Sequence, residues 1–241
     1  MTSLTILSSN DSAVLGALFD PEASLSTGTQ IDASLPQGFD PTELQSIQEE
    51  EREALLLINH AQCNDEDIRA SVSGLSKIID QHPQYASAWS NRAQATRMLF
   101  DAEQLANHID ELRSIMGDLA QAIFLATPPS PADSVSSQNA RVLSAAHTHR
   151  GYLLWLASRS DGLSKAISAL GEPWNGRSEG QLEEMASREF ALGGRYGNDI
   201  ARQLAVKTNP YAKLCGSIVR EAMRKEIADY CQISVAKIQS N

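Results

Sequence analysis

Large and small side chains recur along this chain at a fixed distance, and that recurrence limits the folds open to it more than any other feature. Leu55 and Trp89 lie 34 positions apart, and Ala93 follows Trp89 one helical turn later. His147 and Gly151 form a later pair of the same kind. A period of about 34 residues is typical of stacked helix–turn–helix units. The spacing predicts paired helices that approach closely at the small residue.

Helical periodicity extends over almost the whole chain from residue 42 onward. Hydrophobic residues make up 42% of the sequence and aromatic residues only 5%, which suits packed helices better than β-sheets. We predict an all-α fold, an α-α superhelix of three repeats followed by C-terminal capping helices. The repeats are expected over about 42–85, 86–126 and 141–194, and the capping helices over 195–235.

Two insertions interrupt the regular spacing, at 101–112 and at the Pro/Ser-rich stretch 127–137. The helix that starts at Thr42 is expected to continue to about Cys63. Its glutamate run, 49–51, is predicted to be a solvated part of the helix start, where acidic residues suit the helix dipole.

The N-terminal segment, residues 1–41, differs in charge from the rest of the chain. Residues 1–51 contain nine acidic residues and no Lys or Arg, although the whole chain has a formal net charge of only −10. Within it, the apolar spacing of 10–20 predicts a short amphipathic helix that ends before Pro21. This helix is either a docking element or cap, or a transient helix in a flexible tail. Residues 22–41, with their Gly and Pro, are predicted to be a linker.

Composition excludes several classes of function. An N-terminus without basic residues does not fit a secretion or transit signal, and no apolar stretch is long enough to span a bilayer. No basic tract suits nucleic acid. We therefore expect a cytoplasmic protein. Because disulfides are rare in the cytosol, we expect Cys63, Cys215 and Cys231 to be reduced, structural thiols.

The sequence offers no catalytic constellation. His147 and His149 are two positions apart, so on a helix they point in different directions and do not share a metal ion. The chain has no phosphate-binding loop and no nucleophile elbow, and the glycine-containing stretch 193–199 lacks the preceding strand that such motifs need. We predict a protein that is not an enzyme and that has no cofactor.

Three segments carry a resemblance to a known family. They are NDSAVLGALFDPE near the start, ASAWSNRAQA at 86–95 and NPYAKLC at 209–215. In this order they resemble the tetratricopeptide repeat protein 36 family, from Asn10 to about Met223. The resemblance implies a small adaptor of three tetratricopeptide repeats without catalytic activity. It also implies association with Hsp70-type chaperones and a link to tyrosine catabolism through a client enzyme.

Stacked tetratricopeptide repeats form a concave groove lined by the first helix of each pair. Counted on this sequence, the groove positions that offer polar or aromatic side chains are His60, Ser87, Asn91, Gln94, Arg97, His149, Tyr152 and Trp155. We predict that these residues bind a partner protein or peptide, since polar groups and aromatic anchors are both frequent at recognition surfaces.

Members of this fold that capture chaperone tails use a five-residue carboxylate clamp. The corresponding positions here are Leu56, His60, Asn91, Ala145 and His149, of which only Asn91 matches the clamp. Because the lysines and the arginine are absent, the sequence does not predict strong capture of an acidic tail.

Several alternatives remain open at this point. Asn91 could form a hydrogen bond inside its repeat, and Trp155 could pack against residues 161–170. The acidic segment 1–41 could occupy the groove as an internal competitor, because a short tether gives an effective concentration on the order of mM. The chain could also be an obligate structural subunit of one client complex. If the protein is an adaptor, we expect it to be a monomer.

Overall fold

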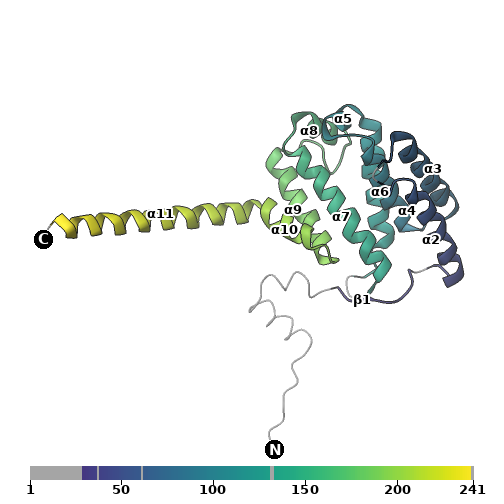
Figure 1. Cartoon of the computed structure of the whole chain (residues 1–241), viewed down its shortest axis with the longest axis horizontal. Helices are drawn as coiled ribbons and strands as arrows, with labels where there is room; N and C mark the ends of the chain where they lie inside the picture. The colour runs from purple at the N-terminus through teal and green to yellow at the C-terminus, as the bar shows by residue number, and fades with distance from the viewer. Residues whose placement is uncertain (1–28, 37, 61, 131–132, 240–241) are drawn as a thin grey trace, which may run out of the picture.

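A computed structural model describes residues 29–36, 38–60, 62–130 and 133–239 of the chain. The predicted all-α helical repeat is confirmed (Figure 1). The helices are α2 (Pro41–Leu56), α3 (Asp65–Gln81), α4 (Ala86–Met98), α5 (Ala102–Asn107), α6 (Ile109–Ala126), α7 (Ser137–Ala157), α8 (Asp161–Ser168), α9 (Glu179–Arg195), α10 (Asp199–Thr208) and α11 (Pro210–Gln239). Two short strands, β1 (Ile31–Asp32) and β2 (Val135–Ser136), complete the described elements.

Three helix pairs stack into a superhelix. Helix α2 packs on α3, α4 on α6, and α7 on α9, and further contacts of α3 with α4 and of α6 with α7 join successive pairs. Figure 1 shows this succession running from α2 to α10. The short helices α5 and α8 pack against each other. They lie outside the three pairs, so the insertion at 101–112 adds a helix without separating α4 from α6.

Small residues sit where the paired helices come closest. Ala93 is completely buried. At Gly151, a Cβ atom would lie 3.0 Å from Cδ1 of Phe190, which belongs to the partner helix α9. A larger side chain at either position would force the helices of the pair apart. The predicted close approach is therefore confirmed at Gly151 in the third pair, and in the second pair Ala93 belongs to the core.

The first pair differs from the expected register. Its first helix starts at Pro41, next to the expected Thr42, and Asp40 caps it through the backbone N–H groups of Thr42 and Glu43. It ends at Leu56 instead of continuing to Cys63, because the N–H groups of Ile58 and Asn59 bond to carbonyl oxygens only three residues earlier. The small residue at its closest approach is Ala54, whose Cβ lies 3.1 Å from the position of a Cβ on Gly74.

Buried ion pairs reinforce the second and third pairs. Arg92 of α4 donates from Nε and Nη2 to Asp118 of α6, at 2.8 and 2.7 Å. In the third pair, Glu189 of α9 accepts from Nη2 of Arg150 at 2.8 Å and lies 2.8 Å from Nδ1 of His147. Each pair of helices is thus joined by a charged contact as well as by apolar packing.

Part of the predicted linker packs against the second insertion. β1 pairs with β2 in parallel, with Ile31 opposite Val135. Pro36 is buried, and the ring of Phe39 meets Tyr85 edge-on at 5.9 Å between centroids. The expectation of a plain linker up to residue 41 was therefore wrong for these residues. The helix predicted over 10–20 lies outside the described residues.

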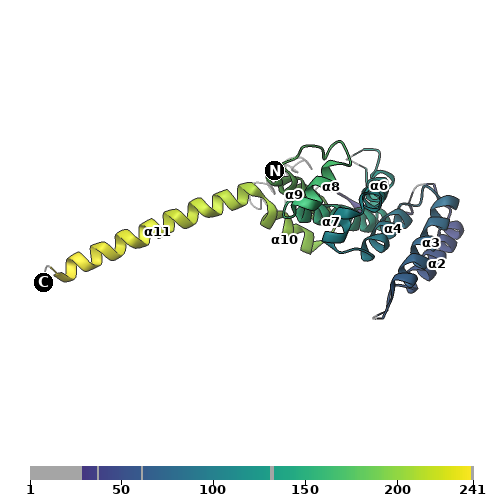
Figure 2. The ribbon, with the colours of Figure 1, turned by 90° about the horizontal axis from the view of Figure 1, so that it is seen from above.

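The last helix leaves the stack. Helix α10 packs along α9, whereas α11 extends away from the other helices (Figure 2). Cys215 is exposed on α11 and is a free thiol, as is Cys63, so the prediction of a structural role for Cys215 was wrong. The side chain of Cys231 is outside the description. Within the described residues, no helix is long and apolar enough to cross a membrane.

Candidate functional site

The first helices of the three pairs line a hollow of about 430 Å³. Because α2, α4 and α7 lie next to one another on one side of the stack, each presents one face to this hollow. Helix α2 contributes Gln48 and Glu51, and α7 contributes Gln138, Arg141, Val142 and Ala145. Between them lie Ser87, Ser90 and Asn91 of α4 and Tyr85, the residue before α4. We call this surface the concave groove.

A continuous hydrogen-bond network crosses the concave groove and is centred on Glu51. The carboxylate of Glu51 accepts from the hydroxyl of Tyr85 at 2.7 Å and from Nδ2 of Asn91 at 2.8 Å. Gln138 donates from Nε2 to the Tyr85 hydroxyl at 3.1 Å and accepts from Gln48 at 3.0 Å. The network joins α2, α4 and α7, so it holds the groove in one shape.

The charge at the centre of this network is negative. Glu51 is only 8% exposed, and its two hydrogen-bond donors, Tyr85 and Asn91, are neutral. Burial, followed by the nearby charge of Glu51, raises the pKa of Tyr85 well above its usual value. The Tyr85 hydroxyl therefore keeps its proton and remains a donor to the carboxylate.

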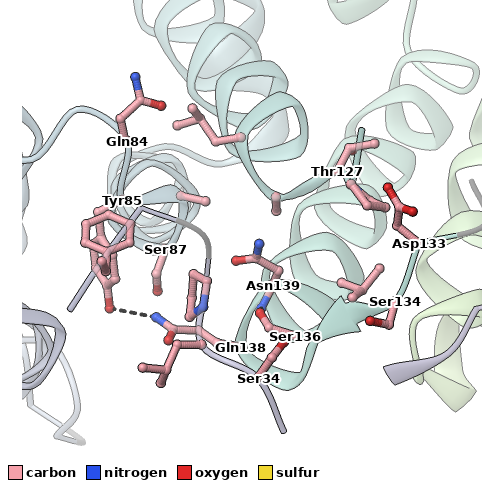
Figure 3. Close-up of a pocket in the computed structure, with 18 of the residues that line it drawn as sticks. Ser34, Gln84, Tyr85, Ser87, Thr127, Asp133, Ser134, Ser136, Gln138 and Asn139 are labelled. Atoms are coloured by element: carbon pink, nitrogen blue, oxygen red, sulfur yellow. Dashed lines mark hydrogen bonds between the residues drawn. The ribbon is translucent and has the colours of Figure 1, made fainter. Parts of the chain in front are cut away.

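Two further hollows extend the groove along α4. One of about 350 Å³ lies between the segment around Phe39 and the starts of α4 and α7, and it shares Tyr85, Ser87 and Gln138 with the groove (Figure 3). Another of about 350 Å³ shares Asn91 and reaches Met98. From Ser87 to Met98 an α-helix rises about 16 Å, which is the length of about five residues of extended chain.

Comparison with known proteins shows the family to which this chain belongs. It is 44% identical over 239 residues to the L-tyrosine degradation gene cluster protein hmgX of Aspergillus fumigatus, and the match covers 92% of this chain and 93% of that protein. This chain belongs to the family of hmgX and tetratricopeptide repeat protein 36. It is 27% identical to tetratricopeptide repeat protein 36 of Xenopus tropicalis, over 90% of this chain and 87% of that protein. For the Homo sapiens protein the identity is 25%, over 89% and 93%.

No protein-family model matches the chain, and no solved structure matches it. The assignment to the tetratricopeptide repeat protein 36 family therefore comes from whole-chain similarity to its relatives, together with the helical-repeat fold.

Three of the sequence-predicted residues lie together in the groove of this family member. Ser87 and Asn91 line its centre and Gln94 lines its extension toward Met98. Asn91 also donates to Ser87 at 3.3 Å. The two readings of Asn91 are therefore compatible, because it forms hydrogen bonds within the fold and still lines the groove.

Arg97 and His149 do not form an exposed, positively charged surface. The guanidinium of Arg97 donates to the carbonyl oxygen of Phe100, and its buried Nε has no hydrogen-bond partner among the described residues. Burial, followed by the positive charge of Arg97, lowers the pKa of His149 to about 4. The imidazole of His149 is therefore neutral at neutral pH.

The other predicted residues lie apart from the groove centre. His60 is in the turn that follows α2, with Nε2 at 3.8 Å from Asp67, because α2 ends before it. Tyr152 is 40% exposed on α7, and its ring lies 5.9 Å from that of Trp155. Trp155 packs against the core, and the guanidinium of Arg159 lies 4.8 Å from its ring centroid.

Sequence reasoning missed Glu51, Tyr85, Gln48, Gln138 and Arg141. The signal for Glu51 was present, because Leu44, Ile47, Glu51 and Ala54 follow helical spacing and all four are buried. The prediction of a solvated glutamate run was wrong for Glu51, although Glu49 and Glu50 are exposed. No signal in one sequence places Gln138 beside Tyr85, since the two residues are 53 positions apart.

The described residues contain no group of three or more His, Cys, Asp or Glu side chains that could hold a metal ion. What the groove offers chemically is a set of fixed hydrogen-bond donors and acceptors around a buried carboxylate. Such a surface suits recognition of a peptide backbone and of its donor groups.

Proposed function

We propose that this protein is a cytoplasmic, non-catalytic adaptor that binds an extended segment of a partner protein in its concave groove. The network from Gln48 to Asn91 is the observation that carries the proposal. It fixes the spacing of α2, α4 and α7, so the groove is preformed and loses little conformational entropy when a segment binds. The polar groups of Gln94 and Arg141 remain exposed along it.

The charge of the groove favours one class of segment. The buried carboxylate of Glu51 attracts Lys, Arg and other N–H donors and repels an acidic tail. Of the basic residues that a groove-bound acidic tail would need, His149 is neutral and His60 lies off the groove, which leaves Arg141 as the basic side chain that lines it. The partner segment therefore presents N–H donors or a basic side chain to Glu51 and an acceptor to Arg141, and this single arginine separates the adaptor from receptors that capture acidic chaperone tails with several basic residues.

The partner that best fits the family is an enzyme of L-tyrosine degradation. Support for this part of the proposal is the name of the relative hmgX, which assigns that protein to an L-tyrosine degradation gene cluster. In this proposal the adaptor acts on tyrosine catabolism through a client enzyme and has no chemistry of its own. An Hsp70-type chaperone is the partner to compare with it.

Filling the groove should abolish most of this binding. Ala145 is exposed on α7 and lines the groove, so an Ala145→Trp side chain would occupy the space of the bound segment. We expect the affinity for the client enzyme to fall at least about tenfold, the equivalent of about 1.4 kcal/mol. The measurement is calorimetric titration of each purified enzyme of L-tyrosine degradation, and of an Hsp70-type chaperone, with the full-length protein.

Ala70→Trp is the matched control, because Ala70 is equally exposed but lies on α3, the second helix of its pair. This variant should bind as the unsubstituted protein does. Equal affinities for the Ala145→Trp and Ala70→Trp variants would move the binding surface away from the groove. If only the chaperone bound, the partner would be the chaperone and not an enzyme of L-tyrosine degradation.

A second candidate function is that of an obligate structural subunit, and α11 is the observation that favours it. Large apolar side chains along α11 are more than half exposed, namely Tyr211, Leu214, Ile218, Val219, Met223 and Ile227. A permanent partner would cover such a stripe. Light scattering of the purified protein separates the candidates: an adaptor should be a soluble monomer, whereas an obligate subunit should aggregate without its partner.

A further inference from the structure

Another hollow, of about 450 Å³, lies between α9 and α10, away from the concave groove. Its apolar lining includes Ala191, Ala205 and Val206, and Val206 is 57% exposed. The basic residues Arg195, Arg202 and Lys207 also line it. We call this surface the α9–α10 hollow. Helices α9 and α10 lie at the end of the helical stack from which α11 departs (Figure 1).

The α9–α10 hollow has more basic residues than acidic partners for them. Arg202 donates to Asp199 at 2.9 Å and to the carbonyl oxygen of Gly194 at 3.2 Å. Arg195 donates from Nε to the hydroxyl of Thr29, a neutral group, at 2.6 Å. The hollow therefore combines an apolar floor with a positively charged edge, which suits a segment that is apolar on one face and acidic elsewhere.

The described chain begins at the edge of this hollow. Thr29 is the first described residue and is held by Arg195, which lines the α9–α10 hollow as well as a smaller hollow that contains Thr29. The residues that precede Thr29 therefore start beside the hollow. From Thr29 back to Asp20 an extended chain reaches about 30 Å, and an eleven-residue helix adds about 16 Å.

The sequence before Thr29 has the composition that the hollow requires. Residues 1–28 contain Asp11, Asp20 and Glu22 and no Lys or Arg. Within 10–20, the apolar residues follow the spacing i, i+1, i+4, i+5, which groups them on one side of a helix; they are Val14, Leu15, Leu18 and Phe19.

We propose that residues 10–20 dock as an amphipathic helix in the α9–α10 hollow of the same chain. The apolar face covers Ala205 and Val206, and the acidic residues lie against Arg195, Arg202 and Lys207. The concave groove is the less suitable site for the same segment, because its floor carries the buried carboxylate of Glu51. The tether at Thr29 favours the same chain over a second copy, since it gives an effective concentration on the order of 1 mM.

Photocrosslinking identifies where the segment lies. Phe19 is replaced by benzoylphenylalanine in the full-length protein, which is irradiated, digested and analysed by mass spectrometry. We expect crosslinks to peptides of α9 and α10 in a product that runs as a single chain. Crosslinks to α2, α4 or α7 would place the segment in the concave groove, and crosslinks between two chains would make the contact intermolecular. Either result, or the absence of a crosslink, overturns the proposal.

Hydrogen exchange measures the docking itself. If a short helix binds this hollow with a dissociation constant on the order of 0.1 mM, an effective concentration of about 1 mM keeps it docked about ten times more often than free. Leu18→Asp disrupts the apolar face, so amides in Asp199–Thr208 should exchange up to about tenfold faster in this variant.

Ala13→Asp is the matched control, because it adds the same charge on the opposite side of the predicted helix. Exchange in α10 should then remain as in the unsubstituted protein. If Leu18→Asp leaves the exchange of α10 unchanged, the segment does not dock there. Neither experiment involves a client enzyme, so its outcome is independent of the proposed adaptor function.

Discussion

Replacing Asp118 by Ala is expected to lower the free energy of unfolding by about 3 kcal/mol, the lower end of the range for breaking a buried ion pair. The Asp118 side chain is 6% exposed and accepts two hydrogen bonds from Arg92, whose side chain is 19% exposed. Without the carboxylate, the Arg92 guanidinium keeps its hydrogen bond to Ser76 and its position over the Trp89 ring. Neither contact compensates a buried positive charge. Urea unfolding followed by circular dichroism measures the loss.

Asp110→Ala is the control on the same helix. Asp110 also contacts an arginine, Arg113, at 2.7 Å, but the two side chains are 87% and 54% exposed, so the loss should be below about 1 kcal/mol. The double variant Arg92→Met, Asp118→Leu should recover much of the loss, because apolar residues of similar size often replace a buried pair without cost. An Asp118→Ala variant as stable as Asp110→Ala would show that the pair is not effectively buried.

The fold was predictable from sequence because its main requirement is local. Trp89, Ala93 and Gly151 mark the close approach of paired helices through side-chain size and spacing alone, and the structure places Gly151 at such a contact and Ala93 in the core. Whole-chain similarity supports the family that the short motifs indicated.

The first helix was predicted too long because its end depends on a turn that the repeat spacing does not show. Its start at Pro41 lies next to the expected Thr42, whereas residues 57–60 form turns instead of continuing the helix. The groove residues of α2 are Gln48 and Glu51, whereas the repeat spacing selected His60, which lies beyond the end of the helix.

The candidate site was only partly predictable, because its central network joins residues far apart in the chain. Asn91 and Ser87 were found from helical spacing, since both lie on one face of α4. Tyr85 and Gln138 acquire their role only when α4 and α7 are packed together. The charge state of His149 was not predictable either, because it is determined by burial.

The charge state of His149 makes the stability of this protein depend on pH above the range in which carboxylates titrate. Its pKa is about 4 in the folded protein and about 6.5 in the unfolded chain. Between these values the unfolded chain binds more protons, so the free energy of unfolding falls as the pH decreases. From pH 8 to pH 5, His149 should account for a loss of about 2 kcal/mol.

His149→Gln should remove this loss, because glutamine does not take up a proton. We expect urea unfolding at pH 8 and at pH 5 to show that the variant gains about 2 kcal/mol relative to the unsubstituted protein as the pH is lowered. Gln94→Ala, which changes an exposed side chain that does not titrate, should keep the pH dependence of the unsubstituted protein. A His149→Gln variant with the pH dependence of the unsubstituted protein would mean that His149 accepts a proton in the folded state as readily as in the unfolded chain.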